Sequence, residues 1–194
     1  LALDGAICDQ LGLRAQVADN TSSMGTAFLE SIEARQGVTT GISAADRSHT
    51  ILTALKPDAV PEDLARPGHM FPLRARKGGV LVRPGQTEGS VDLARLAGLR
   101  AGGVICEIMN DDGTMARMPE LEVFAKKYDM PIVTVEALIE NRPRRERLID
   151  RRVQGVRMPT RYGDFTAHLY TALNDDKEHV ALTFGWSDAP DGDN

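Results

Sequence analysis

Apolar residues recur along this chain with two spacings, one typical of strands and one typical of helices. Short apolar runs and alternating stretches predict strands, whereas apolar residues three or four positions apart predict helices. The predicted strands are 26–34, 79–82, 103–109, 131–135, 161–170 and 179–184. The predicted helices begin at or just after Ser43, Ser90, Pro119 and Glu136. Strands that alternate with helices indicate an α/β domain with a layered sheet flanked by helices.

Local signals support the ends of several elements. Ser43 and Asp46 have the S-x-x-D spacing of a capping box, in which the serine hydroxyl accepts a hydrogen bond from a helix N–H group. Pro119 suits the first turn of a helix, where its missing N–H would have no partner. Asp112 and Gly113 form a turn pair. These residues predict where two helices begin and where one turn lies.

The chain changes character near residue 141. A charged stretch covers residues 141–147, and Arg151 and Arg152 follow it closely. Such stretches are typical of linkers and solvated helix ends. We therefore expect one domain over residues 1–148 and a second, β-rich segment over residues 149–194. The tail, 188–194, is too polar to bury apolar surface and predicts disorder.

Composition limits the partners and the location. Apolar residues make up 42% of the 194 residues, which is enough for a normal core. The net charge of −5 gives no general attraction to nucleic acid or to an anionic membrane, so an anionic substrate must be held by a few local cations. The two cysteines, Cys8 and Cys106, make neither a disulfide framework nor a zinc site, and they indicate a reducing cytoplasm.

His69 is the first residue that could carry chemistry. It follows Arg66-Pro67-Gly68, and the Pro-Gly pair predicts a turn that fixes the histidine on a loop. A histidine so placed can act as a general acid or base near neutral pH. The alternative is a histidine that only faces solvent or caps an element.

Residues 83–87, Arg-Pro-Gly-Gln-Thr, form the second candidate site. They connect a predicted strand to a predicted helix, so backbone N–H groups and the positive end of the helix dipole point toward one place. Arg83 adds a bidentate cation and Thr87 adds a hydroxyl. The pattern predicts a phosphate-binding turn, and the alternative is an ordinary connection.

Glu107 is the third candidate, because it interrupts the apolar run 104–109. A carboxylate buried on a strand costs free energy unless it is paired or protonated. A carboxyl group in such surroundings is suited to proton transfer. The alternative is that Glu107 faces solvent on an alternating strand.

Several strings, taken together, resemble one enzyme family, the 3,4-dihydroxy-2-butanone 4-phosphate synthases. The order and spacing of the strings agree with that family over roughly residues 1–148. The strings are 19–22, 37–47, 66–74, 78–81, 87–88, 92–94 and 110–116.

The resemblance implies a reaction and a set of roles. Enzymes of this family convert D-ribulose 5-phosphate into 3,4-dihydroxy-2-butanone 4-phosphate and formate, in riboflavin biosynthesis. They use magnesium or manganese and act as homodimers with active sites at the interface. His69 and Glu107 would be the catalytic acid and base. The sugar phosphate would be bound by Arg83, Pro84, Gly85, Gln86, Thr87 and Glu107.

The chain departs from the family in two respects. Gln86 stands where the family usually carries a histidine that binds magnesium, although an amide oxygen is also a ligand that magnesium accepts. The family's acidic segment, with a metal-binding glutamate, would precede Leu1. We therefore expect a chain that is truncated at both ends and inactive by itself.

The end of the chain resembles a second family. Residues 159–165 and 178–182 are similar to the opening of a GTP cyclohydrolase II domain, which is often fused to the synthase in a bifunctional protein. Two functions of different classes remain open. One is the magnesium-dependent lyase. The other is a non-catalytic synthase-like domain that supports dimerisation or a fused GTP cyclohydrolase II.

Overall fold

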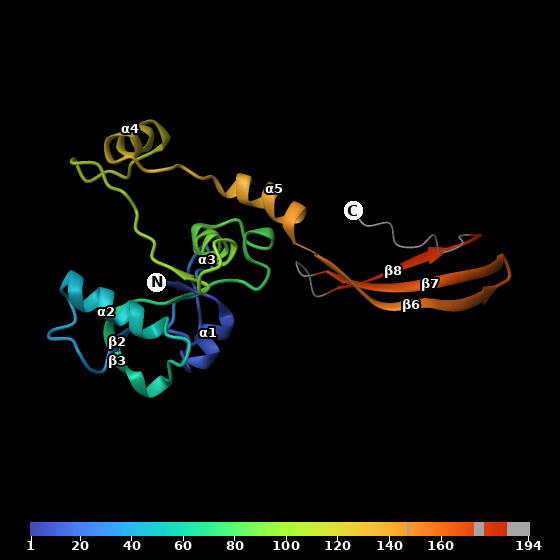
Figure 1. The fold of residues 1–194 in the computed structure, drawn as a ribbon, viewed down its shortest axis with the longest axis horizontal. Coiled ribbons are helices and arrows are strands. Elements are labelled where there is room, and N and C mark those ends of the chain that lie inside the picture. Colours follow the sequence, from blue (N-terminus) through green and yellow to red (C-terminus); the bar gives the residue numbers. More distant parts are fainter. Residues whose placement is uncertain (147, 173–176, 186–194) are drawn as a thin grey trace. The chain divides into compact units, whose positions relative to one another are not determined.

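The computed structural model describes residues 1–146, 148–172 and 177–185 (Figure 1). The chain divides into two compact units, Leu1–Asn141 and Arg142–Asn194. The division falls within the charged stretch that begins at residue 141. The tail predicted to be disordered, 188–194, lies outside the described residues. Along the described ranges, no helix combines the length and the apolar character needed to cross a membrane.

The first unit contains short strands and five α-helices, the last of which continues into the second unit. Its strands are β1 (Ala2–Leu3), β2 (Ile32–Ala34), β3 (Leu64–Met70), β4 (Leu73–Arg74) and β5 (Gly102–Gly103). Its helices are α1 (Gly5–Gln10), α2 (Ala44–Ala54), α3 (Gln86–Leu96), α4 (Met118–Tyr128) and α5 (Val135–Arg145), with 3-10 turns at Pro61–Asp63 and Gly79–Leu81. The mixed α/β class predicted from the sequence is confirmed, with a β-rich region at the end of the chain.

Two small sheets hold the core of this unit. In the first, β1 lies between β4 and β5, parallel to β4 and antiparallel to β5. In the second, β2 pairs antiparallel with β3, and α2 packs against both strands. The fully buried side chains include Leu3, Leu11, Ile32 and Leu64. Their burial removes apolar surface from water and is the main source of stability in this unit.

Helix α2 begins as the sequence predicts. Ser43 is its N-cap residue, and the backbone N–H of Asp46 donates a hydrogen bond of 3.0 Å to the Ser43 hydroxyl. Helix α4 also begins at the predicted place, with Pro119 in its first turn. The turn at Asp112–Gly113 is present as well, closed by a hydrogen bond from the Gly113 N–H to the Asn110 carbonyl.

Residues 79–82 are not the strand that their apolar composition predicts. They form a 3-10 turn, because Gly78 and Gly79 both have positive φ angles, of 92° and 61°. The N–H of Val80 is satisfied by the Asp92 carboxylate at 2.8 Å rather than by a neighbouring strand. The helix that follows begins at Gln86, four residues before the predicted start at Ser90.

The strands predicted at 103–109 and 131–135 are also wrong. Only Gly102–Gly103 pairs with another strand, and residues 131–134 lie outside any helix or strand. A strand is stable when its backbone groups have partners, and among the described residues no strand pairs with either stretch beyond Gly103. Their apolar side chains are therefore exposed, including Val104, Met109, Ile132 and Val133. Of the predicted strand 26–34, only Ile32–Ala34 forms the regular strand β2, and Phe28 and Leu29 make isolated bridges to Leu73 and Ala15.

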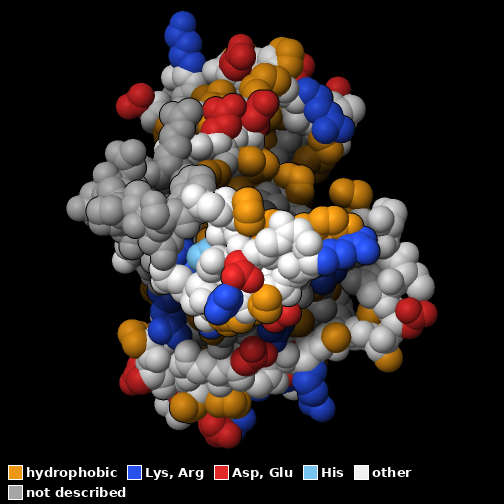
Figure 2. Space-filling view, turned by 90° about the vertical axis from the view of Figure 1, so that its right-hand side faces the viewer, with side chains coloured by type: hydrophobic (Ala, Val, Ile, Leu, Met, Phe, Trp, Pro, Cys, Tyr) orange, Lys and Arg blue, Asp and Glu red, His pale blue; other side chains and the backbone are white. Residues whose placement is uncertain are grey.

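The second unit is an antiparallel sheet of β6 (Ile149–Thr160), β7 (Gly163–Ala172) and β8 (Glu178–Thr183), in that order. Strands β7 and β8 match the two predicted strands at the end of the chain. Strand β6 was not predicted, because charged residues such as Arg151 and Arg152 break its apolar pattern. All twelve of its residues are exposed. Figure 2 shows hydrophobic side chains at the surface among acidic and basic ones.

Candidate active site

The start of helix α3 is the centre of the site predicted from residues 83–87. Gly85 is the N-cap residue and offers no side-chain hydrogen bond to the helix, so the first N–H groups of α3 have no side-chain cap there. Such N–H groups, with the helix dipole, favour an anion. Gln86, the first helical residue, is exposed, whereas Thr87 is buried.

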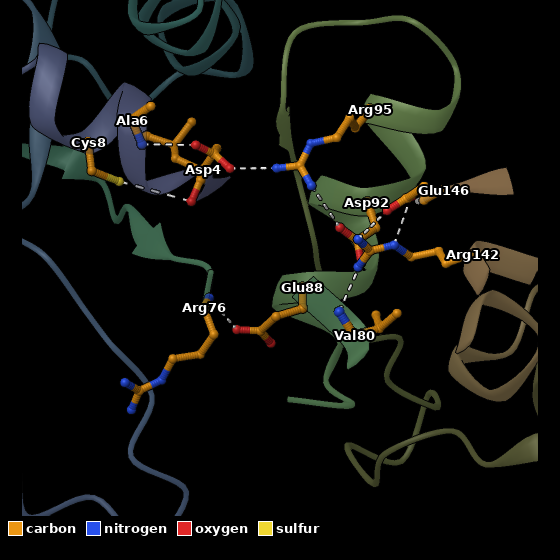
Figure 3. Close-up of polar contacts among 11 residues, drawn as sticks. Asp4, Ala6, Cys8, Arg76, Val80, Glu88, Asp92, Arg95, Arg142 and Glu146 are labelled. Carbon is orange, nitrogen blue, oxygen red and sulfur yellow. Dashed lines mark hydrogen bonds and ion pairs between the residues drawn. The ribbon is translucent and has the colours of Figure 1, made fainter. Parts of the chain in front are cut away.

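Two buried carboxylates of α3 shape the turn that leads into the helix. Glu88 is 1% exposed and accepts a hydrogen bond of 3.0 Å from the Arg76 N–H (Figure 3). It also accepts one of 2.7 Å from Arg83 Nη1. Asp92 is equally buried and accepts from the Val80 N–H. A Cβ atom on Gly79 would overlap the Asp92 carboxylate. The sequence predicts no role for Glu88 or Asp92, although their i, i+4 spacing places them on one face of α3.

Arg83 is therefore held in place by the protein itself. Its side chain is a quarter exposed, and one Nη group is bound to Glu88. A guanidinium has five N–H donors, so the remaining donors can still bind an anion. The buried glutamate orients the cation that the sequence assigned to the phosphate.

Glu107 does not lie on a buried strand. It is exposed on an extended stretch after β5, which matches the solvent-facing alternative rather than the buried one. It lines a cavity of about 670 Å³ together with Gln86 from the start of α3. The other lining residues are mostly apolar and come from 104–108, 115–121 and 131–133. The structure thus brings two of the predicted site residues, Gln86 and Glu107, into one cavity.

His69 lies elsewhere in the same unit. It is on β3, not on the predicted loop, and its Nδ1 atom lies 3.0 Å from Glu33 Oε1 on β2. Its side chain is 43% exposed. Within this single chain, His69, Arg83 and Thr87 are not among the residues that line the cavity with Glu107.

The motif at residues 37–47 forms a loop that leads into the first turn of α2, and Asp46 of that turn closes the loop. Its carboxylate accepts hydrogen bonds from the Thr39 hydroxyl at 2.9 Å and from the Gly41 N–H at 3.0 Å. These hydrogen bonds, that of the Thr39 hydroxyl first, lower the pKa of Asp46 below its ordinary value. The loop leads into α2, and α2 contacts β2. The loop therefore lies near that strand.

The oxygen donors in the cavity are a partial set for a metal ion. Magnesium is commonly bound by one or two protein oxygens, with water and substrate phosphate completing its six positions. Glu107 and Gln86 supply a carboxylate and an amide oxygen in one cavity. In the part of the chain that the structure describes, no three residues of the types His, Cys, Asp and Glu gather as a metal site.

Comparisons with known proteins agree with this architecture. The sequence model of the 3,4-dihydroxy-2-butanone 4-phosphate synthase family matches residues 1–141. The riboflavin biosynthesis protein RibBA of Aquifex aeolicus is 54% identical over 187 residues, which are 95% of this chain and 46% of that protein. The chain therefore spans about half the length of the curated relatives that it matches.

Solved structures support the same conclusion. The structure of RibBX, a two-domain 3,4-dihydroxy-2-butanone 4-phosphate synthase from A. baumannii, has a TM-score of 0.82 and 43% identity, and the match covers 95% of this chain and 54% of that one. A synthase structure in complex with two magnesium ions has a TM-score of 0.65 and 36% identity, covering 72% of this chain and 70% of that one. The fold is thus that of the synthases in these solved structures. The chain belongs to the 3,4-dihydroxy-2-butanone 4-phosphate synthase family.

Proposed function

We propose that the protein carrying this chain converts D-ribulose 5-phosphate into 3,4-dihydroxy-2-butanone 4-phosphate and formate, as a step of riboflavin biosynthesis. The observation that supports this most directly is the cavity lined by Glu107 and Gln86. It adjoins the start of α3, within the span that the family model matches. The free thiols of Cys8 and Cys106 agree with the cytoplasmic location that we also propose.

In this proposal the residues around α3 bind the sugar phosphate. Arg83, held by Glu88, supplies the cation, and the uncapped first turn of α3 supplies N–H donors. Pro84 and Gly85 shape the approach to the helix, and Gln86 and Thr87 begin it. Substrate binding thus combines one fixed guanidinium with backbone donors, which suits a phosphate better than a neutral group.

Glu107 and His69 are the proposed catalytic residues. Glu107 is exposed in the cavity, so its carboxylate can accept a proton from a carbon next to the ketose carbonyl. His69 exposes part of its ring and can return or remove a second proton. Because His69 does not line the cavity within one chain, we propose a homodimer in which a second copy brings His69 to the cavity.

A divalent metal, magnesium or manganese, is part of the proposal. The residue that would hold it is Gln86, through its amide oxygen, beside the Glu107 carboxylate. Such an ion, when bound, polarises a substrate carbonyl. The support is the oxygen donor set of the cavity and the relative that was solved with two magnesium ions.

We further propose that residues 1–148 form the synthase domain and residues 149–194 begin a GTP cyclohydrolase II-like domain. The antiparallel sheet of β6, β7 and β8 belongs to this second part. The match to RibBA extends past residue 141, where the synthase family model ends. The alternative function is a non-catalytic synthase-like domain that supports dimerisation or a fused cyclohydrolase, and the presence of Gln86 favours it.

The deciding experiment measures formate released from ribulose 5-phosphate, with and without magnesium. We expect metal-dependent release by the whole protein that carries this chain, and loss of release in its Glu107→Gln variant, which keeps the shape of the side chain but removes the base. Glu122→Gln, an exposed glutamate of α4 outside the cavity lining, is the matched control and should retain activity. No release by a protein that binds ribulose 5-phosphate would favour the non-catalytic alternative. Release that does not depend on magnesium would keep the lyase but contradict the proposed metal site.

A further inference from the structure

The strand pair that carries His69 is built around a close backbone approach. A Cβ atom on Gly68 would overlap the backbone of Ile32 and Glu33, so only glycine allows β3 to lie so near β2. The Gly68 N–H donates to the Ser31 hydroxyl at 3.2 Å. The register between the strands shifts between Ile32 and Glu33, next to this contact. The irregular register beside Gly68 brings the His69 side chain to Glu33, whose own partner in the strand register is Ala65.

The contact between the two side chains fixes the direction of the hydrogen bond. Glu33 Oε1 lies 3.0 Å from His69 Nδ1. A carboxylate oxygen only accepts hydrogen bonds, so Nδ1 carries the proton. In a neutral imidazole the other nitrogen, Nε2, is then unprotonated and can accept a proton. The His69 side chain is 43% exposed, so part of its ring can meet a substrate.

A second glycine leaves the space that the Glu33 carboxylate occupies. Gly41 has a φ angle of 81°, and a Cβ atom there would overlap the carboxylate of Glu33. The Gly41 N–H is itself fixed by Asp46. The loop before α2 thus passes against the Glu33 carboxylate at Gly41, and the Glu33 side chain is only 17% exposed. An ordinary surface ion pair contributes little to stability and does not require a glycine to make room for it.

We propose that Glu33 is a positioning residue, which holds His69 with its proton on Nδ1 so that Nε2 serves as the base toward the substrate. The role of His69 rests on the function proposed above. Glu33 itself acts only through the histidine. Carboxylates that orient a catalytic imidazole in this manner have large effects on turnover and small effects on substrate binding.

The test combines a measurement of the His69 tautomer with steady-state kinetics. Two-bond ¹H–¹⁵N correlation spectra distinguish the two imidazole nitrogens, and His69→Gln identifies the His69 signals. In Glu33→Gln the amide can donate as well as accept, so both tautomers should appear. The kcat for formate release should fall about 100-fold, and KM should change by less than about threefold. Glu33→Asp restores an acceptor-only group and should recover part of both properties.

Glu30→Gln is the matched control, because Glu30 is similarly exposed, at 21%, and pairs with Arg66 instead of a histidine. It should leave the His69 tautomer and kcat unchanged. If the His69 proton stays on Nδ1 and kcat is retained in Glu33→Gln, the positioning role is overturned. If the tautomer changes in Glu33→Gln but the wild-type protein releases no formate, the proposed function fails while the role of Glu33 in orienting His69 is supported.

Discussion

Buried carboxylates decide where the charged groups of the site point. Burial of Glu88 costs free energy unless its charge is paired, and it is paired with Arg83 and with the Arg76 N–H. The sequence predicts Arg83 as a phosphate ligand from its place before a helix, but it does not reveal which acid restrains it. The fold is needed to identify that acid, because the buried face of a helix is known only once the elements packed against the helix are known.

The two cysteines should react very differently with iodoacetamide. Burial raises the pKa of the Cys8 thiol to about 11, so at pH 8 only about 0.1% of it is thiolate. Cys106 is exposed and lines the cavity with Glu107. We expect rapid labelling of Cys106 in the folded protein, slow labelling of Cys8, and slower labelling of Cys106 when ribulose 5-phosphate is present.

Peptide mass spectrometry after timed labelling measures both rates. Cys8→Ser should leave the fast reaction intact, and Cys106→Ser should remove it. Equal rates for the two thiols would contradict the burial of Cys8. Labelling of Cys106 that ribulose 5-phosphate does not slow would instead argue against substrate binding in this cavity.

At the scale of elements, the sequence predicts helices better than strands. The start of α2 follows from Ser43 and Asp46, which lie close together and need no distant partner. Strands at 103–109 and 131–135 were predicted from apolar composition alone, yet composition does not supply a neighbouring strand. His69 was placed on a loop because Pro67 and Gly68 usually break strands, whereas Gly68 here permits a close strand pair.

The loop closed by Asp46 should make the free energy of unfolding depend on pH in the acid range. The pKa of Asp46 is lowered in the folded protein. The folded state therefore favours the charged carboxylate and holds fewer protons than the unfolded state. The stabilisation is therefore fully present above the ordinary aspartate pKa of about 4 and is lost as the pH falls below it. Asp46→Asn should lower stability at pH 7 and flatten the acid limb of the stability profile.

Urea unfolding followed between pH 3 and pH 7 measures this effect. Asp58→Asn is a suitable control. Asp58 is exposed, and among the described residues it does not close a loop as Asp46 does. An acid limb in Asp46→Asn as steep as that of the wild type would show that other carboxyl groups account for the pH dependence.

At the scale of the whole molecule, the site residues are divided between two places on one chain. Gln86 and Glu107 share a cavity, while His69 lies on the β2–β3 pair with Glu33. The family resemblance in the sequence indicates which residues belong to the site, and it implies a dimer. It does not indicate which of them come from the same copy, because that depends on how two surfaces meet.

If each active site combines His69 of one copy with Glu107 of the other, two inactive variants should restore each other. We would prepare His69→Ala and Glu107→Gln separately, then mix them under conditions that exchange subunits. Random pairing makes half of the dimers mixed, and each mixed dimer has one intact site of two, so formate release should recover to about 25% of wild type. Mixing two batches of Glu107→Gln is the control and should recover nothing.

Native mass spectrometry shows whether mixed dimers form. If they form and yet release no formate, His69 and Glu107 of one copy belong to the same site. The cavity of the single chain would then have to close around His69 by a rearrangement within that chain.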